Sequence, residues 1–130
     1  MILVDTSVWI EFFKGRNTPE ALYLSQAIEN EEDLCTCGPV LQEVLQGIRA
    51  DAEHGQTKEY LLSLVYLPVG KARYLDAADI YRGARRRGET LRKPIDCVIA
   101  ACAIRQSALL LERDSDFDAI ARYAPLKLCL

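Results

Sequence analysis

Histidine is almost missing from this chain of 130 residues, in which His54 is the only one. Catalysis by two imidazoles and a zinc site built on paired histidines are therefore excluded. His54 lies in a polar stretch, and no nucleophile elbow that could complete a Ser-His-Asp triad stands near it. No glycine-rich phosphate-binding loop of either common type is present. Enzymatic chemistry would have to depend on carboxylates, hydroxyls, arginines or a group that these side chains bind.

The chain also lacks a cysteine pattern and a long apolar run, and we expect no export signal. The five cysteines are an odd number, and the spacing of Cys35 and Cys37 is a poor one for structural zinc. The longest uncharged apolar run, residues 97–104, is too short to span a bilayer. The N-terminus reaches Asp5 too soon for a secretory signal. We therefore expect a cytoplasmic protein with reduced thiols and no membrane segment.

Length and composition favour a single globular domain over residues 1–130, because half of the residues are hydrophobic and no linker or repeat interrupts them. The net charge is only −3, but its distribution is uneven. Half of the 16 basic residues lie between positions 70 and 93, namely Lys71, Arg73, Arg82, Arg85, Arg86, Arg87, Arg92 and Lys93. This segment either faces a polyanion or forms a solvated helix end and loop.

Short apolar segments alternate with helical patterns along the chain. The predicted strands cover residues 1–4, 34–36, 65–69, 108–111 and 126–128, with Pro68 indicating an edge strand. The predicted helices cover residues 8–14, 18–30, 38–48, 52–63, 71–87, 94–106 and 117–123. This alternation predicts an α/β fold with a mainly parallel sheet that is covered on both faces.

Several acids follow a predicted strand or lie early in a predicted helix, and these are Asp5, Glu43, Asp96 and Asp114. Such positions gather at one edge of a parallel sheet, where ligands bind. Like charges in one cleft require raised pKa values or counterions. Mg²⁺ and Mn²⁺ prefer oxygen ligands of this kind, and ions held by carboxylates activate water for attack on a phosphodiester.

Each acid also has a purely structural interpretation. Asp96 is the only strongly polar side chain between positions 95 and 104, so it is paired, protonated or metal-bound, unless it merely meets the helix dipole. Asp5 could cap the helix that follows it, and one aspartate in residues 114–118 caps the last helix. Glu43 lies beside an apolar stripe and could be a partly exposed surface residue.

Four segments stand out together by their order and spacing. They are Ile2-Leu-Val-Asp5-Thr-Ser-Val-Trp9-Ile, Val40-Leu-Gln-Glu43-Val-Leu-Gln-Gly47, Gly88-Glu-Thr-Leu-Arg-Lys-Pro-Ile-Asp96-Cys-Val-Ile-Ala-Ala and Leu110-Leu-Glu-Arg-Asp114-Ser-Asp116-Phe117. In these segments the chain resembles PIN-domain ribonucleases, and more closely the VapC-type toxins of bacterial and archaeal toxin–antitoxin pairs. The resemblance covers the whole chain.

The resemblance implies a three-layer α/β/α domain with an acidic cleft. Asp5, Glu43, Asp96 and Asp114 match the acidic quartet of the family, and Asp116 matches a further acid. The implied activity is endoribonuclease cleavage, often of transfer or ribosomal RNA, with Mg²⁺ as the cofactor and Mn²⁺ as a substitute. We expect Asp5 and Asp96 to hold the ion directly, with Glu43, Asp114 and Asp116 completing the shell.

The resemblance also implies partners. They are a small VapB-type antitoxin that blocks the cleft and binds operator DNA, and a second copy of the chain in a homodimer. For the homodimer we expect apolar surface beside the first helix, at Trp9, Phe12 and Phe13. The candidates for holding the RNA backbone are Arg85, Arg86, Arg87, Arg92 and Lys93.

One departure from the family concerns Glu112, which stands where many relatives have Thr or Ser. Thr6 and Ser7 remain as hydroxyl candidates. The alternative function is a catalytically silent PIN-like module that only binds RNA or protein. Loss of one or more acids would mark such a module, and here every acid is present.

Overall fold

The computed structural model describes all 130 residues, and a five-stranded parallel sheet forms its centre. The strands are β1 (Ile2–Val4), β2 (Leu34–Cys37), β3 (Val65–Leu67), β4 (Leu109–Leu111) and β5 (Lys127–Leu128). Their order is β3-β2-β1-β4-β5, and every neighbouring pair is parallel. Ile2 of the central strand aligns with Leu34 on one side and Leu109 on the other. β1 is buried throughout, which agrees with its uninterrupted apolar sequence.

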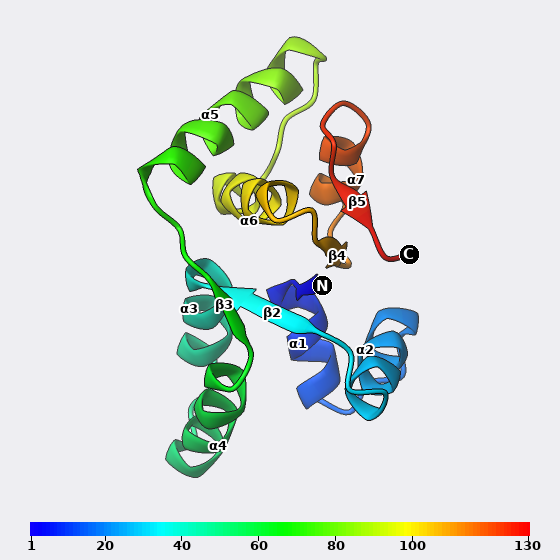
Figure 1. Ribbon diagram of the computed structural model, residues 1–130, viewed down its shortest axis with the longest axis vertical. Coiled ribbons are helices and arrows are strands. Elements are labelled where there is room, and N and C mark those ends of the chain that lie inside the picture. The colour runs from blue at the N-terminus through cyan, green and yellow to red at the C-terminus, as the bar shows by residue number, and fades with distance from the viewer.

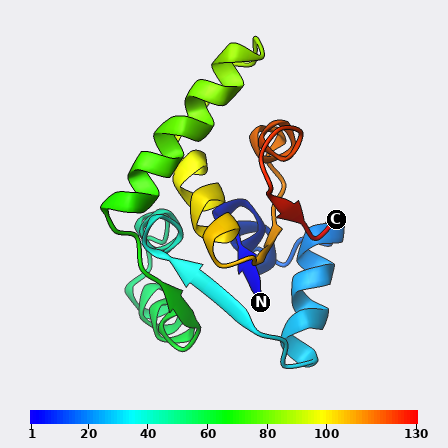
Figure 2. The same cartoon turned by 45° about the horizontal axis from the view of Figure 1, so that its top comes forward.

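Seven helices cover the two faces of the sheet. They are α1 (Thr6–Phe13), α2 (Pro19–Glu29), α3 (Gly38–Gln46), α4 (Asp51–Leu62), α5 (Lys71–Arg86), α6 (Pro94–Arg105) and α7 (Ser115–Ala121). Helices α1 to α4 lie on one side of the strands, and α5 to α7 lie on the other (Figures 1 and 2). This arrangement confirms the predicted three-layer α/β/α fold. None of the helices combines the length and apolar character needed to cross a membrane.

Most elements lie where the sequence predicts them, and the differences have local causes. Helix α1 begins at Thr6 rather than at residue 8, because the Asp5 side chain caps it by accepting the Ser7 N–H. Helix α7 begins at Ser115 rather than at residue 117, because Asp114 caps it in the same way. β3 lies at the edge of the sheet, as Pro68 indicated.

The aromatic residues of α1 belong to the core. Trp9 is fully buried, with its ring stacked on Phe13 at 5.6 Å between centroids and edge-on to Phe12 and Tyr60. The expectation that Trp9 contributes exposed apolar surface for a homodimer is therefore wrong. Phe12 and Phe13 are half-buried and pack against the same core. A dimer surface on α1 would have to use Ile10, which is 39% exposed, and the exposed parts of Phe12 and Phe13.

Candidate active site

The acids meet at the place in the sheet where the order of the strands reverses. The chain adds β2 and β3 on one side of β1 and later adds β4 and β5 on the other side. Asp5 directly follows β1, and Asp114 follows β4 after a two-residue gap. In open parallel sheets the carboxyl ends of the two strands at such a point border a ligand crevice. The topology therefore brings together acids that are more than a hundred positions apart in the sequence.

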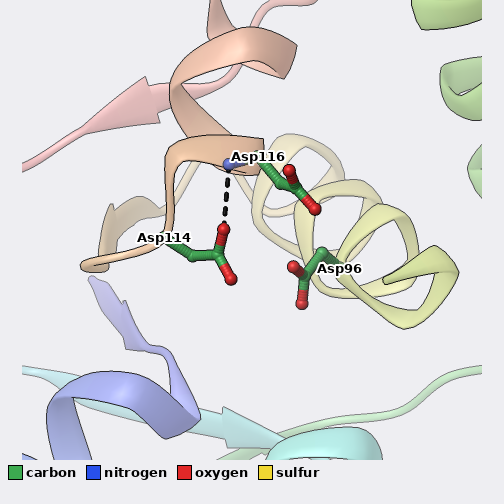
Figure 3. A group of neighbouring side chains, drawn as sticks. All are labelled: Asp96, Asp114 and Asp116. Carbon is green, nitrogen blue, oxygen red and sulfur yellow. Dashed lines mark hydrogen bonds between the residues drawn. The ribbon is translucent and has the colours of Figure 1, made fainter. Parts of the chain in front are cut away.

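Asp96, Asp114 and Asp116 form the tightest acidic group, which we call the aspartate triad. One carboxylate oxygen of each residue lies within 4.8 Å of the others. Asp114 and Asp116 extend from the start of α7 toward Asp96, which comes from the first turn of α6 (Figure 3). All three side chains are buried, with exposed fractions between 3% and 8%. Three carboxylates at this separation repel one another unless a proton or a cation intervenes.

Asp96 is the least satisfied member of the triad. Its Oδ2 atom is buried and accepts no hydrogen bond. Burial, followed by the negative charges of Asp5 and Asp114, raises its pKa to about 7. Asp96 does lie in the first turn of its helix, as the dipole interpretation requires, but a helix dipole does not supply the missing partner. A buried carboxylate oxygen without a donor fits a divalent cation, which such a group can bind directly.

Asp5 acts both as a helix cap and as a site acid. Its Oδ2 accepts hydrogen bonds from the Ser7 backbone N–H at 3.1 Å and from Ser7 Oγ at 2.6 Å. The side chain is only 4% exposed, and burial raises its pKa, although the bonds from Ser7 act in the opposite direction. Both bonds go to Oδ2, so Oδ1 remains for a further partner.

The segment before α6 supplies cations to the triad. Arg92 Nη2 lies 3.2 Å from Asp114 Oδ1, and Lys93 Nζ lies 3.2 Å from Asp114 Oδ2. The Arg92 backbone N–H donates to Asp116 Oδ2 at 2.8 Å. Burial alone would raise the pKa of Asp114, but the Asp116 N–H and the two cations outweigh it, and the pKa lies below its ordinary value. Arg92 and Lys93 were proposed for the RNA backbone, and they lie beside the acids with more than half of each side chain exposed.

Glu43 lies outside the triad but is joined to the same edge of the sheet. Its Oε1 accepts a hydrogen bond from Thr6 Oγ1 at 3.0 Å, and Thr6 follows Asp5. The side chain is half-buried on α3, so the description of Glu43 as partly exposed holds. Its carboxylate nevertheless points to α1 and the site rather than only to solvent.

Glu112 is an acid of the site that the sequence analysis did not assign. Its Oε2 accepts the Asp114 backbone N–H at 2.7 Å. Burial and the nearby Asp118 raise the pKa of Glu112 to about 8. The available signal was its position between the end of β4 and Asp114, where a third carboxylate joins those of Asp114 and Asp116.

The other proposed RNA contacts lie earlier in the same basic segment. Arg85, Arg86 and Arg87 are exposed at the end of α5. The Arg85 guanidinium lies 5.3 Å from the centroid of the Tyr81 ring, and that of Arg87 lies 4.7 Å from the Tyr123 ring. These contacts orient two of the three arginines without burying them.

Comparison with known proteins agrees with this arrangement. The model of the PIN domain family matches residues 2–123, so the chain belongs to the PIN-domain family. Within it, the chain belongs to the VapC group, because ribonuclease VapC11 of Mycobacterium tuberculosis is 40% identical over 129 residues. That match covers 98% of this chain and 96% of VapC11.

Solved structures share the fold at lower sequence identity. FitAcB from Neisseria gonorrhoeae superimposes with a TM-score of 0.75 at 21% identity, covering 98% of this chain and 96% of that one. VapBC2 from Rickettsia felis, bound to a DNA fragment from its promoter, gives a TM-score of 0.74 at 16% identity, covering 98% and 97%. These likenesses show that the chain shares the α/β/α fold of both proteins.

Proposed function

We propose that this protein is a metal-dependent endoribonuclease and the toxin of a toxin–antitoxin pair. The observation that carries the proposal is the buried Asp96 carboxylate, whose Oδ2 has no donor and which lies within 4.8 Å of oxygens of Asp114 and Asp116. The relatives that are 40% identical over nearly the whole chain are named ribonucleases, which supports the same activity here. Mg²⁺ is the proposed ion, with Mn²⁺ as a substitute, because every available ligand is an oxygen.

We assign the direct metal contacts to Asp5 and Asp96. Asp96 Oδ2 accepts no hydrogen bond from the protein, and both bonds from Ser7 reach Oδ2 of Asp5, whereas Asp114 and Asp116 are engaged by Arg92 and Lys93. Asp114, Asp116 and Glu43 then complete the shell, some of them through water. When bound by these residues, a divalent cation would supply a more acidic water molecule and a positive charge beside the phosphodiester.

The remaining steps depend on side chains around this centre. Glu43 is held through Oε1 by Thr6, which leaves Oε2 to accept the proton of the attacking water. Ser7 fixes the orientation of Asp5, because it donates to Oδ2 from both its backbone and its hydroxyl. The exposed cations Arg92 and Lys93 hold phosphates of the RNA at the entrance, where the acids alone would repel them.

The proposed biology follows from the relatives. The toxin acts in the cytoplasm, and a VapB-type antitoxin covers the cleft and carries the complex to operator DNA. The structure of a relative, VapBC2, bound to promoter DNA supports this role. A small neighbouring reading frame that encodes a DNA-binding protein, and that co-purifies with this chain, is the expected partner.

The direct test is incubation of the purified protein with total RNA, followed by mapping of the new ends. We expect cleavage at defined sites with Mg²⁺ or Mn²⁺ and none with a chelator. A catalytically silent module would bind RNA and leave it intact under every metal condition. Cleavage that persists in chelator would contradict the metal dependence.

A further inference from the structure

A cavity of about 220 Å³ opens beside Glu43, and the proposed mechanism does not use it. Its apolar wall comes from Ile10 and Phe13 of α1 and from Ile48, which follows α3. Glu43 lines the same cavity and accepts the hydrogen bond from Thr6, next to Asp5. The cavity therefore lies between α3 and the second half of α1, and Glu43 links it to the acidic site.

The rim of this cavity is charged. Lys14 and Arg49 line it and are exposed, and neither takes part in an ion pair within the protein. Glu53, at the start of α4, lines it as well and presents a carboxylate that can only accept hydrogen bonds when ionised. An aromatic and aliphatic wall with unpaired cations at its mouth matches a planar base attached to a phosphate.

We propose that this cavity binds one unpaired nucleotide of the RNA, next to the phosphodiester that is cut. The base lies against Phe13 and Ile48, while Lys14 and Arg49 hold its phosphate. Glu53 accepts a hydrogen bond from the exocyclic amino group of the base, so cytosine and adenine are preferred to uracil and hypoxanthine. This inference rests on the proposed ribonuclease function, whose substrate preference it specifies.

The position and the charge of the cavity favour a nucleotide as its occupant. Glu43 lines the cavity and is hydrogen-bonded to Thr6, next to Asp5, so the cavity is a neighbour of the acids that would hold the phosphate. Its cations suit a phosphate better than an apolar helix of a protein partner. A segment of the antitoxin is the competing occupant, and the experiment below distinguishes the two.

The chain contains a built-in reporter for this cavity. Trp9 is the only tryptophan, and its ring stacks on Phe13 at 5.6 Å with 17° between the planes. A base that packs against Phe13 changes the surroundings of the indole without touching it. Trp9 fluorescence therefore follows occupancy of the cavity in the intact protein, without any cleavage.

The experiment titrates the protein, in chelator, with nucleoside monophosphates that differ in one exocyclic group. We expect CMP to change Trp9 fluorescence saturably and UMP to bind roughly tenfold more weakly. IMP should likewise bind more weakly than AMP. Ribose 5-phosphate should give no change. Because no divalent ion is present, these results do not depend on whether the protein cuts RNA.

Variants then locate the binding to the cavity. Gly47 lines it and has a backbone conformation (φ −84°, ψ −10°) open to any residue. A Cβ there meets only backbone oxygens at 3.6 and 3.7 Å, so Gly47→Leu fills the cavity without removing a side chain. We expect it to abolish the CMP response, while Gly55→Leu, where a Cβ meets nothing within 4 Å, preserves it.

Single charge changes test the assigned contacts. Arg49→Ala should weaken CMP binding roughly tenfold, and Arg105→Ala, an exposed arginine outside the cavity, should not. Glu53→Gln should reduce the difference between CMP and UMP. Equal binding of CMP and UMP, or a response to ribose 5-phosphate alone, would overturn the proposal. It would also fall if no nucleotide bound and Gly47→Leu instead prevented capture of the cognate antitoxin.

Discussion

Asp96 occupies a position that a stable fold would not select for a carboxylate. The other buried residues of α6, positions 97–103, are alanines, cysteines, Val98 and Ile99. Burial and neighbouring acids raise the pKa of Asp96 to about 7, so its charged form destabilises the folded state. The proposed metal contact accounts for a side chain with this cost. The isolation of Asp96 in an apolar helix already indicated this in the sequence.

The pKa of Asp96 predicts a pH dependence of stability in the absence of metal. Below about pH 4 the residue is protonated in both states, because its ordinary pKa is 3.8. Between about pH 4 and pH 7 the unfolded chain releases the proton and the folded chain keeps it. The free energy of unfolding should therefore fall as pH rises through this interval and level off above it.

The measurement compares urea unfolding of the wild type and Asp96→Asn in chelator across this interval. Subtracting the two curves removes the titration of distant groups. The wild type should lose stability relative to the variant as pH rises. A constant difference between the two proteins would show that Asp96 titrates normally.

The loops that carry the site were less predictable than the helices and strands. Acids placed after apolar strands could be located from the sequence, because the carboxyl ends of parallel strands share an edge. The start of α7 could not, since the sequence offered several aspartates as its cap and only the structure identifies Asp114. The contacts of Arg92 and Lys93 with Asp114 depend on how the segment before α6 packs against α7, which periodicity does not encode.

Asp114 should show two separable roles, because it caps α7 and belongs to the aspartate triad. Asparagine caps helices about as well as aspartate, whereas alanine does not. Asp114→Asn should therefore keep the cap, lose only the ion pairs with Arg92 and Lys93, and lose cleavage, so its melting temperature in chelator should fall less than that of the alanine variant. Asp114→Ala should lose cleavage and also about 1 kcal/mol of stability. Equal melting temperatures for the two variants would contradict the capping role.

The end of α5 should contribute to RNA binding through Arg85, Arg86 and Arg87. Replacing all three by alanine should weaken binding and reduce the salt dependence, since each lost phosphate contact lowers the slope by about one unit. A matched control replaces Lys58, Arg105 and Lys127, which are exposed, lie outside the basic segment and change the net charge equally. If the salt dependence of RNA binding stayed unchanged without the arginines, they would be only a solvated helix end. Loss of the antitoxin complex with normal RNA binding would assign them to the partner.

At the scale of the whole molecule, two features could be predicted from the sequence and a third could not. The α/β alternation and the uneven charge could be read directly from residues 1–130. The strand order could not, because it depends on the crossover from β3 to β4 that places β4 beside β1. That order juxtaposes Asp5 with Asp96 and Asp114, and it turns separate motifs into one site.

The homodimer stays a prediction, but its contact surface is no longer expected to include Trp9. Trp9 is buried, and Tyr74 and Leu75 on α5, with 54% and 63% exposed, present more apolar surface than the residues of α1. Sedimentation at micromolar concentration should show a dimer. Leu75→Glu should weaken it, whereas Leu22→Glu, an exposed leucine on α2, should not. A wild-type protein that sediments only as a monomer would contradict the prediction.

The most direct test of the account is RNA cleavage by Asp96→Asn in the presence of Mg²⁺. This substitution keeps the shape of the side chain and removes one charge from the acidic site. We predict that cleavage falls by more than about 100-fold. The melting temperature in chelator should stay equal or rise, because repulsion among the buried acids is relieved. A folded Asp96→Asn protein that cuts RNA at the wild-type rate would contradict the proposed metal-dependent mechanism.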